Sequence, residues 1–585
     1  GVFNAQGRNL SLRQPLSPWQ VIYGQARVGG DVTFVFLSSD KKHLHVVVTL
    51  ACHACEEIGD VWLNDEVITA AMLNANGEVI SGKYARIIPT THQDTFSSSP
   101  ATTSHPVDSV QLVVHSSQDA DSVLIWIMLT DVSPAAPGLN QYSRSGNVIT
   151  VHSSQSSNFT VDYTEVVGTS FCRIKKSLGT ESGQPFIDLV AESEGKWTDA
   201  HRQTGHTKLY IRFEVSVLES GMPAISAVLK GAKLHDPRTG LTAWIANAAL
   251  ARLAYLTNAD FGFGAELATE IGTAEFIAAA NVCDERVSLA TATTTFTADP
   301  ATDAIALAAK SRMPQVGDGV RVSSTGTLPA PLAAATTYYV VQRSGLLKLA
   351  TSFANALAGT AIDLTTAGSG THTLTYWDEP RYRANGAFRL SERPAEILER
   401  LLAADAGTLT QISDKWRTFS GAYETATITL AEKDFAGPIQ IDPMPARQEW
   451  ANGAKGVFVD PDNNWQPTDF PGLASATYLS LDGGERIWAD LDLTAFVTSS
   501  TQAQRLAKVE LLRRRHGLTV TALFKLTAWR AMTGHSVALT FAKYGWTAKE
   551  FAIVDSGFAV IEGDGGPALG VQLVLRETAA AIYDW

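Results

Sequence analysis

Residues 231–264, GAKLHDPRTGLTAWIANAALARLAYLTNADFGFG, decide how the rest of the chain is organised. The stretch begins as a strand end, turns through residues 236–240 (DPRTG), and continues into a helix whose aromatic and aliphatic residues share one face. It stops at a double-glycine turn, Gly262-Phe263-Gly264. Because no residue set in it has a catalytic pattern, we predict a structural joint whose angle is fixed by the Asp-Pro-Arg turn, with Arg238 in a buried ion pair.

The length and composition of the chain indicate a large, mainly β protein. The chain has 585 residues, of which 45% are hydrophobic and 18% charged, and strand-like runs outnumber helical ones. This length predicts roughly three to five domains. A net charge of −13 argues against a protein that coats nucleic acid, because such a protein needs a basic footprint. The four cysteines exclude a disulfide scaffold and favour assembly in a reducing cytoplasm.

The chain ends and apolar runs give further expectations. No run reaches the roughly 18 apolar residues that a membrane-spanning helix needs. The sequence starts at Gly1 without a basic and apolar leader, and it stops abruptly at Trp585. We therefore expect the natural chain to extend beyond the printed one.

Changes in composition and periodicity along the chain predict a multidomain fold, mainly β with α+β parts. Amphipathic helices are expected at 394–405 and 501–516, the first beginning at a proline and the second followed by Gly517. Residues 287–378 are rich in Thr, Ala and Gly and carry many short strands, which is typical of a small inserted module. The predicted parts are an N-terminal arm (1–18), two interleaved β domains (19–235), an α/β domain (236–286 with 379–440), an inserted β module (287–378) and a C-terminal β-barrel domain with one helix (441–585).

Two short motifs could hold a metal ion. Cys52-His53-Ala54-Cys55 is a CxxC, but a structural zinc site needs four ligands, and Cys172 and Cys283 lie far away in the sequence. Residues 460–464 (DPDNN) resemble half a calcium loop, without the glycine and the closing glutamate that such loops use. Buried strand cysteines and an Asx turn are the simpler interpretations, so no metal ligand is predicted.

Two charged clusters could serve binding or catalysis. Arg513-Arg514-Arg515 with His516 could meet a phosphate, but a run at a helix C-terminus is more often a solvated or interface end. Asp482 and Glu485 share a turn, whereas a glycosidase needs two carboxylates opposed across a cleft. The sequence has no GxSxG, HExxH or P-loop pattern. We predict no catalytic residue, no cofactor site and no enzymatic activity.

A series of motifs across almost the whole chain resembles one family. The motifs are residues 19–30 (WQVIYGQARVGG), 236–240 (DPRTG), Trp244 with 247–250 (NAAL), 262–264 (GFG), 381–386 (RYRANG), 415–417 (KWR), 459–462 (VDPD), and 575–577 (LRE) with 583–585 (YDW). Their order resembles that of the central tail-tip proteins, also called J-like host-specificity proteins, of lambda-like siphophages. Taken together the motifs are specific, although none of them is decisive alone.

The chain departs from the family pattern in three places. The family usually has Trp-Ser-x-Asn where this chain has residues 244–247 (WIAN). The 287–378 module lies outside the common core and is similar to small β modules inserted in various phage tail proteins. Its signature is residues 316–318 (VGD), 329–332 (PAPL) and 338–340 (YYV). The fibronectin-type domains that usually follow the Tyr-Asp-Trp end are absent from the printed sequence.

The resemblance implies a structural virion protein, the homotrimeric baseplate hub of a siphophage tail tip. Its β-barrel domains would continue the tail tube as a ring, and the α/β domain would close the lumen until DNA ejection. Implied partners are the distal tail protein, other tail-tip proteins and the C-terminus of the tape-measure protein, with tail fibres a further candidate. A host outer-membrane receptor or glycan would be met indirectly, without sequence-specific nucleic-acid binding. Assembly would take place in the host cytoplasm.

One alternative function concerns the inserted module. Its Thr- and Tyr-rich strands and its position as an insertion would suit a carbohydrate-binding or depolymerising tail protein that acts on host surface glycans. The competing interpretation of residues 287–378, which we favour, is a decorative or packing domain.

Overall fold

The computed structural model describes residues 18–105, 107–118, 124–155, 159–180, 183–218, 221–308, 314, 316–343, 346–443, 450–561 and 567–585. Strands hold 44% of the residues and helices 17%, arranged in many sheets, which confirms the prediction of a multidomain, mainly β protein. The predicted arm at 1–18 lies outside the described residues except for Pro18. No helix in these ranges has the length and apolar character needed to span a membrane.

The N-terminal unit is a pair of four-stranded sheets that share a core of aliphatic residues, among them Val46, Leu209 and Ile225. Every residue of the strand Ile225–Lys230 is buried, as expected for a central strand. Helix α1 (Ile187–Glu192) covers the outer side of one sheet around Tyr210. The sheets are β2 (Gln25–Gly29), β17 (Ile225–Lys230), β5 (Glu57–Leu63) and β6 (Glu66–Ile68), and β15 (Cys172–Ser177), β16 (Thr207–Glu214), β4 (His43–Ala51) and β3 (Asp31–Leu37).

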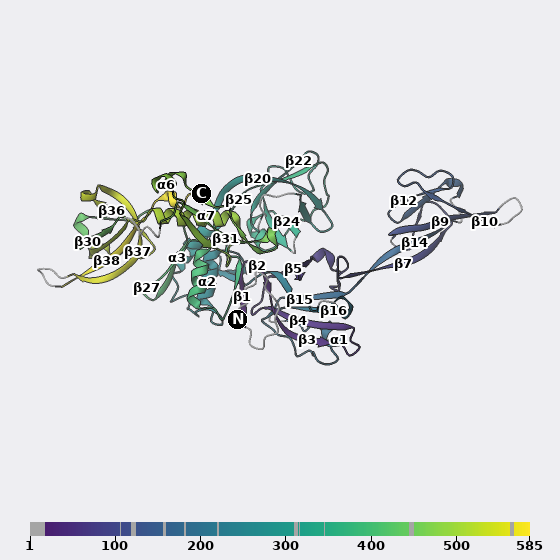
Figure 1. Ribbon diagram of the computed structural model, residues 1–585, viewed down its shortest axis with the longest axis horizontal. Helices are drawn as coiled ribbons and strands as arrows, with labels where there is room; N and C mark the ends of the chain where they lie inside the picture. The colour runs from purple at the N-terminus through teal and green to yellow at the C-terminus, as the bar shows by residue number, and fades with distance from the viewer. Residues whose placement is uncertain are drawn as a thin grey trace.

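A distal unit is inserted into the N-terminal unit and stands well apart from it (Figure 1). Two long antiparallel strands, β7 (Ala85–Phe96) and β14 (Phe159–Ser170), carry the chain out and back. The unit has its own core, which includes Val113, Ile149 and Phe159. Its sheets are β10 (Leu124–Met128), β9 (Ser109–Gln118), β14 and β7, and β11 (Thr130–Asp131), β12 (Gln141–Ser145), β13 (Val148–Val151) and β8 (Ala101–Thr102).

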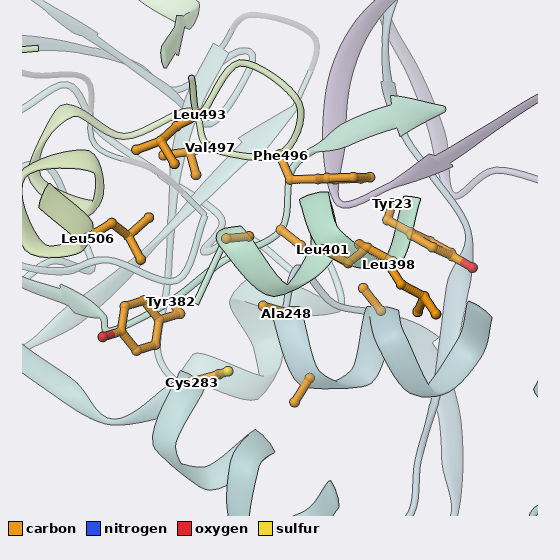
Figure 2. Packing of buried hydrophobic residues seen from close by; sticks show 14 of the residues in the cluster. Tyr23, Ala248, Cys283, Tyr382, Leu398, Leu401, Leu493, Phe496, Val497 and Leu506 are labelled. Atoms are coloured by element: carbon orange, nitrogen blue, oxygen red, sulfur yellow. The ribbon is translucent and has the colours of Figure 1, made fainter. Parts of the chain in front are cut away.

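The central body surrounds the largest hydrophobic core, to which helices far apart in sequence contribute (Figure 2). Its helices are α2 (Ala248–Thr257), α3 (Thr273–Asp284), α5 (Pro394–Ala403), α6 (Ala476–Leu481) and α7 (Ser500–Arg515). Strand pairs at its margin are β1 (Gln20–Tyr23) with β26 (Gly386–Arg389), β18 (Lys233–Asp236) with β19 (Leu241–Trp244), and β27 (Thr408–Ile412) with β28 (Lys415–Phe419). A four-stranded sheet completes it, made of β31 (Gly453–Asp460), β32 (Gln466–Asp469), β33 (Leu473–Ala474) and β34 (Trp488–Asp492).

A closed six-stranded barrel is inserted between α3 and the rest of the central body. Its interior is filled by its own aliphatic and aromatic side chains, including Val320, Leu374 and Tyr376. A short helix, α4 (Phe353–Leu357), packs on strands β23 and β24. The barrel order is β20 (Arg286–Asp299), β21 (Ala304–Leu307), β24 (Leu346–Ala350), β23 (Tyr338–Arg343), β22 (Gly319–Ser324) and β25 (His372–Pro380).

The C-terminal unit is a six-stranded sheet whose boundary differs from the predicted 441–585. Two of its strands, β29 and β30, come before or across residue 441, and the described residues 450–515 pack into the central body instead. These residues carry two helices, α6 and α7, rather than one. The sheet order is β29 (Ile428–Ala431), β36 (Ser536–Phe541), β37 (Trp546–Ile561), β38 (Ala568–Glu577), β35 (Thr519–Lys525) and β30 (Phe435–Asp442).

Candidate functional site

The predicted joint is a hairpin followed by a helix, and Arg238 is its electrostatic centre. The guanidinium of Arg238 donates to both oxygens of Asp236, at 2.9 Å and 2.8 Å, and lies 2.8 Å from Asp284 at the end of α3. All three side chains are mostly buried, which confirms the predicted ion pair. Burial raises the pKa of Asp236, but the hydrogen bonds and charge of Arg238 outweigh it and hold that pKa below its usual value. The turn is thereby tied to α3.

Two further side chains fasten the joint to its neighbours. The Trp244 indole donates to the Gly24 carbonyl oxygen at 3.1 Å, linking the joint to the N-terminal unit. Asn247 caps α2, because its Oδ1 accepts from the Leu250 amide at 3.1 Å. The same side chain donates from Nδ2 to the Ala280 carbonyl of α3 at 2.9 Å. The stretch that departs from the Trp-Ser-x-Asn pattern at Ile245 thus keeps Trp244 and Asn247, the two residues that make these contacts.

The double-glycine turn closes the joint through a very close chain approach. A Cβ added to Gly262 would lie 1.7 Å from the Tyr255 carbonyl oxygen, so only glycine fits. Gly264 has a φ of +67°, a left-handed conformation that glycine adopts without strain. Between them, the Phe263 ring packs on Trp416 at 5.8 Å. Residues 262–264 therefore turn the chain back toward its own helix.

A fully buried ion pair, which the sequence analysis missed, holds α2 against the rest of the central body. Arg252 Nη1 lies 2.6 Å from Asp405 Oδ1, and both side chains are 0% exposed. Arg252 Nε also donates to Thr418 at 3.0 Å, and Asp405 accepts from Ser420 at 2.7 Å. The signal in the sequence is an arginine inside the apolar run of α2, since arginine is almost never fully buried without a partner.

A second buried cluster, also missed, joins the inserted barrel to the central body. Arg383 Nη2 lies 2.6 Å from Asp318 Oδ1, and Arg505 Nη1 lies 2.8 Å from Glu379 Oε1. The two carboxylates belong to the barrel, the arginines belong to the central body, and all four are nearly inaccessible to solvent. Paired charges at this depth fix the relative position of two units, because breaking a pair leaves a buried charge uncompensated.

The four cysteines are free, and their surroundings are structural. His53 Nε2 accepts from the Ile22 amide at 3.0 Å, and Cys55 Sγ lies 3.9 Å from His53 Nδ1. Burial raises the pKa of the Cys52 thiol to about 11 and that of Cys55 to about 12, so both stay protonated near neutral pH. In the part of the chain that the structure describes, no three His, Cys, Asp or Glu side chains gather as a metal site would require.

The turn at residues 460–464 makes a contact between units. The Asp460 side chain accepts from the Asp462 amide at 2.9 Å, an Asx turn that starts a short 3₁₀ helix. Asn464 follows with a φ of +53°, and its carbonyl oxygen accepts from Arg27 Nη1 of the N-terminal unit at 3.0 Å. The turn thus docks the central body on the N-terminal unit.

The arginine run of α7 is engaged within the chain. Arg513 donates to the Ala406 carbonyl oxygen at 2.9 Å, and Arg514 pairs with Glu510 at 2.7 Å. Arg515 forms a bidentate pair with Asp482, with Nη1 at 2.9 Å from Oδ1. Asp482 therefore belongs to a structural ion pair, and the Glu485 carbonyl oxygen accepts from Asn452 at 2.7 Å in the same turn.

A cleft of about 650 Å³ separates the central body from the C-terminal sheet. Its lining combines Phe419, Tyr423 and His535 with residues of α3 and of the chain end. His535 Nδ1 lies 2.9 Å from Glu424 Oε1, and this hydrogen bond raises the pKa of His535 against the opposing effect of burial. The cleft lies at the junction between these units.

Comparison with known proteins gives matches to solved structures only. No protein-family model matches the chain, and no curated protein matches it. A chain from the virion of a native gene transfer agent (GTA) particle aligns with 12% identity and a TM-score of 0.48, covering 99% of this chain and 89% of its own. The 43 kDa tail protein of prophage MuSo2 from Shewanella oneidensis aligns with 12% identity and a TM-score of 0.23, covering 51% and 99%. Prophage tail protein gp18 from Listeria monocytogenes EGD-e aligns with 10% identity and a TM-score of 0.21, covering 49% and 94%.

Proposed function

We propose that the protein is a structural component of a phage tail tip, the central hub on which the other tip proteins assemble. One observation carries the proposal: the motifs that resemble the J-like family meet at the junctions between the units. Residues of these motifs lie hundreds of positions apart in sequence, yet they contact each other. These contacts are structural: they hold the units together.

The contacts between motif residues support this directly. The Gln25 amide of the first motif donates to Asn385 Oδ1 at 2.9 Å, and Trp244 donates to Gly24 as described above. The Arg381 guanidinium donates from Nη1 to the Tyr583 carbonyl oxygen at 3.0 Å, which ties the chain end to the central body. A Cβ on Gly24 would lie 2.2 Å from the Ala384 carbonyl oxygen, so that junction also excludes side chains.

In the proposed hub, three copies form a ring that continues the tail tube. The N-terminal and C-terminal sheets would build the wall, and the central body would narrow the lumen until DNA ejection moves it. The distal tail protein, other tip proteins and the tape-measure C-terminus are the proposed partners. Host attachment would be indirect, through receptors or glycans met by the assembled tip.

The glycan-binding alternative receives less support from the barrel. A sugar site is usually built on exposed aromatic rings, whereas Phe296, Tyr338 and Tyr376 are buried in the barrel core. The ion pairs that Arg383 and Arg505 form with Asp318 and Glu379 also hold the barrel against the central body. We therefore propose that the barrel is a packing module.

The test is tail assembly with a variant of the joint. Arg238→Ala removes the cation that ties Asp236 to Asp284, so we expect the joint angle to relax and tail formation to fall sharply in phage complementation. Arg393→Ala is the matched control, because that arginine is 84% exposed and its pair with Glu396 is at the surface. Electron microscopy of the particles would locate the protein. Normal tails from Arg238→Ala, or tails that lack the protein, would contradict the proposal.

A further inference from the structure

The hairpin of β37 and β38 extends past the sheet to which it belongs. Strand β36 pairs with β37 only as far as Ala552, and β35 pairs with β38 only as far as Gly570. From Asp555 to Ile561, β38 is the one strand that pairs with β37 in the described ranges. The outer edge of this overhang, residues 555–561, therefore presents backbone groups to which another strand could pair.

The overhang continues the apolar core face of its sheet into solvent. Phe558 lies directly opposite Val571, and Val560 lies opposite Leu569, so these side chains point to one face. Further along that face Val571 and Leu573 are buried in the core. Phe558, Val560 and Leu569 are 68%, 66% and 50% exposed. A core face left open in this way is typical of an interaction surface.

Strand β3 shows the same feature on the N-terminal unit. Among the described strands it is the edge strand of its sheet and pairs with β4 alone. Val35 and Leu37 lie opposite Val46 and Leu44, which face the core between the two sheets. Val35 and Leu37 are nevertheless 40% and 46% exposed.

Each edge begins at an aspartate, Asp555 or Asp31, and continues as an uncharged apolar run. Residues 556–561 (SGFAVI) and 32–37 (VTFVFL) contain no charge and no proline. Natural edge strands are usually protected from pairing by lysine, proline or an inward-pointing charge. Two edges that each carry an uncharged apolar run are suited to pair with each other. The backbone edge also argues against lipid as the occupant, because a bilayer offers no partner for it.

We propose that the overhang of one copy pairs with β3 of the next copy and adds a fifth strand to its sheet. Phe558 and Val560 would then join Val35 and Leu37 on the core face, and the small residues Gly557 and Ala559 would lie beside Phe34 and Phe36. The two edges lie on different sides of the central body (Figure 1), so the contact is head-to-tail. Head-to-tail contacts close into a ring when the rotation from one copy to the next closes, as the proposed hub requires. This inference rests on the proposed ring and names its contact surface.

Engineered cysteines in the full chain test the pairing. Val560→Cys is combined in turn with Val35→Cys and Leu37→Cys, which share one face of β3. After oxidation we expect at least one double variant to form disulfide-linked trimers on non-reducing gels. Each single variant should give no more cross-linking than the unmodified chain with its four native thiols. The matched control replaces Val560→Cys by Ala559→Cys on the opposite face, and its cross-linking should be several-fold weaker.

The outcomes separate this inference from the hub proposal. Disulfide-linked dimers of the Val560→Cys single variant would show hairpin-to-hairpin contact and overturn the pairing with β3. Trimers in sedimentation velocity without any cross-linking would overturn the pairing and leave the ring standing. A monomer at all concentrations would overturn both.

A charge on the overhang provides an independent test. We expect Phe558→Asp to weaken self-association about tenfold or more, because an aromatic anchor is lost and a charge is buried. Met128→Asp, at a side chain 70% exposed on the distal unit, should leave self-association unchanged. Equal effects of the two variants would contradict the inference, as would Phe558-dependent sedimentation of the protein with phosphatidylcholine vesicles.

Discussion

At the scale of the residue, the contacts between units and between helices are marked by ion pairs that are buried from solvent. Arg252 and Asp405 have no exposed surface, and Thr418 and Ser420 satisfy part of their remaining hydrogen-bonding capacity. Taking two charges out of water is costly, so such a pair is tolerated only where its geometry is fixed by the surrounding fold. The main effect of the pair is therefore to fix the position of α2 against the central body, and its net contribution to the free energy of unfolding is small by comparison.

Breaking this pair should be strongly destabilising. We expect Arg252→Met to lower the free energy of unfolding by about 3–5 kcal/mol, because the Asp405 carboxylate stays buried without its cation. Urea unfolding of the full chain would measure the loss. The double variant Arg252→Met with Asp405→Leu should recover most of it, and the exposed Arg393→Met should change little. A loss below about 1 kcal/mol for Arg252→Met would contradict this account.

The cleft histidine should make the C-terminal junction sensitive to pH. The hydrogen bond that His535 donates to Glu424 raises the folded-state pKa of His535. Its stabilising effect is therefore complete below the unfolded pKa and is lost as pH rises through the folded pKa. We expect His535→Gln to destabilise the protein more at about pH 5 than at about pH 9. Thermal unfolding across this range checks the difference. His201→Gln on the N-terminal unit is a control, and an effect of His535→Gln that does not vary with pH would refute the link.

At the scale of the element, periodicity predicted the helices well and pairing poorly. The helix predicted at 501–516 is α7 (Ser500–Arg515), and the one predicted at 394–405 contains α5 (Pro394–Ala403). Local spacing cannot show that β29 pairs with β36, because the whole 450–515 segment lies between them and packs elsewhere. The Arg252–Asp405 pair was missed for the same reason, since 153 positions separate its members.

The turn at Gly262, which follows α2, could be predicted from the sequence. We expect Gly262→Ala to cost at least about 2 kcal/mol, because the new Cβ would overlap the Tyr255 carbonyl and force the turn away from α2. Urea unfolding gives the magnitude. Gly557→Ala is the matched control, as its Cβ would meet no atom within 4 Å. Equal stability of the two variants would show that the close approach is not required.

At the scale of the whole molecule, the units differ in how firmly they are attached. The barrel is held by two buried ion pairs, whereas the distal unit is joined to the N-terminal unit through β7 and β14 (Figure 1). Ala85 and Ser170 face each other at the base of this connection. The distal unit should therefore be separable without loss of the remaining fold.

Excision of the distal unit tests this separation. We replace residues 86–169 by a short glycine-serine turn between Ala85 and Ser170. The melting temperature of the remaining protein should stay within about 3 °C, because the core around Val46 and Ile225 lies outside the excised segment. Calorimetry should lose one transition and keep the others. Collapse of the N-terminal unit would show that the two units fold as one.

The part of β7 and β14 between the two units also sets how far the distal unit lies from the body. Beyond the strands of the distal unit, Glu165–Ser170 pair with Ala85–Thr90 alone, six residues on each side. At about 3.3 Å per residue, this ribbon holds the distal unit about 20 Å from the body. A domain held at such a distance has a raised effective concentration for a target that lies within its reach. Even weak binding by the distal unit, multiplied over several copies in a particle, would then give avidity without strong individual contacts.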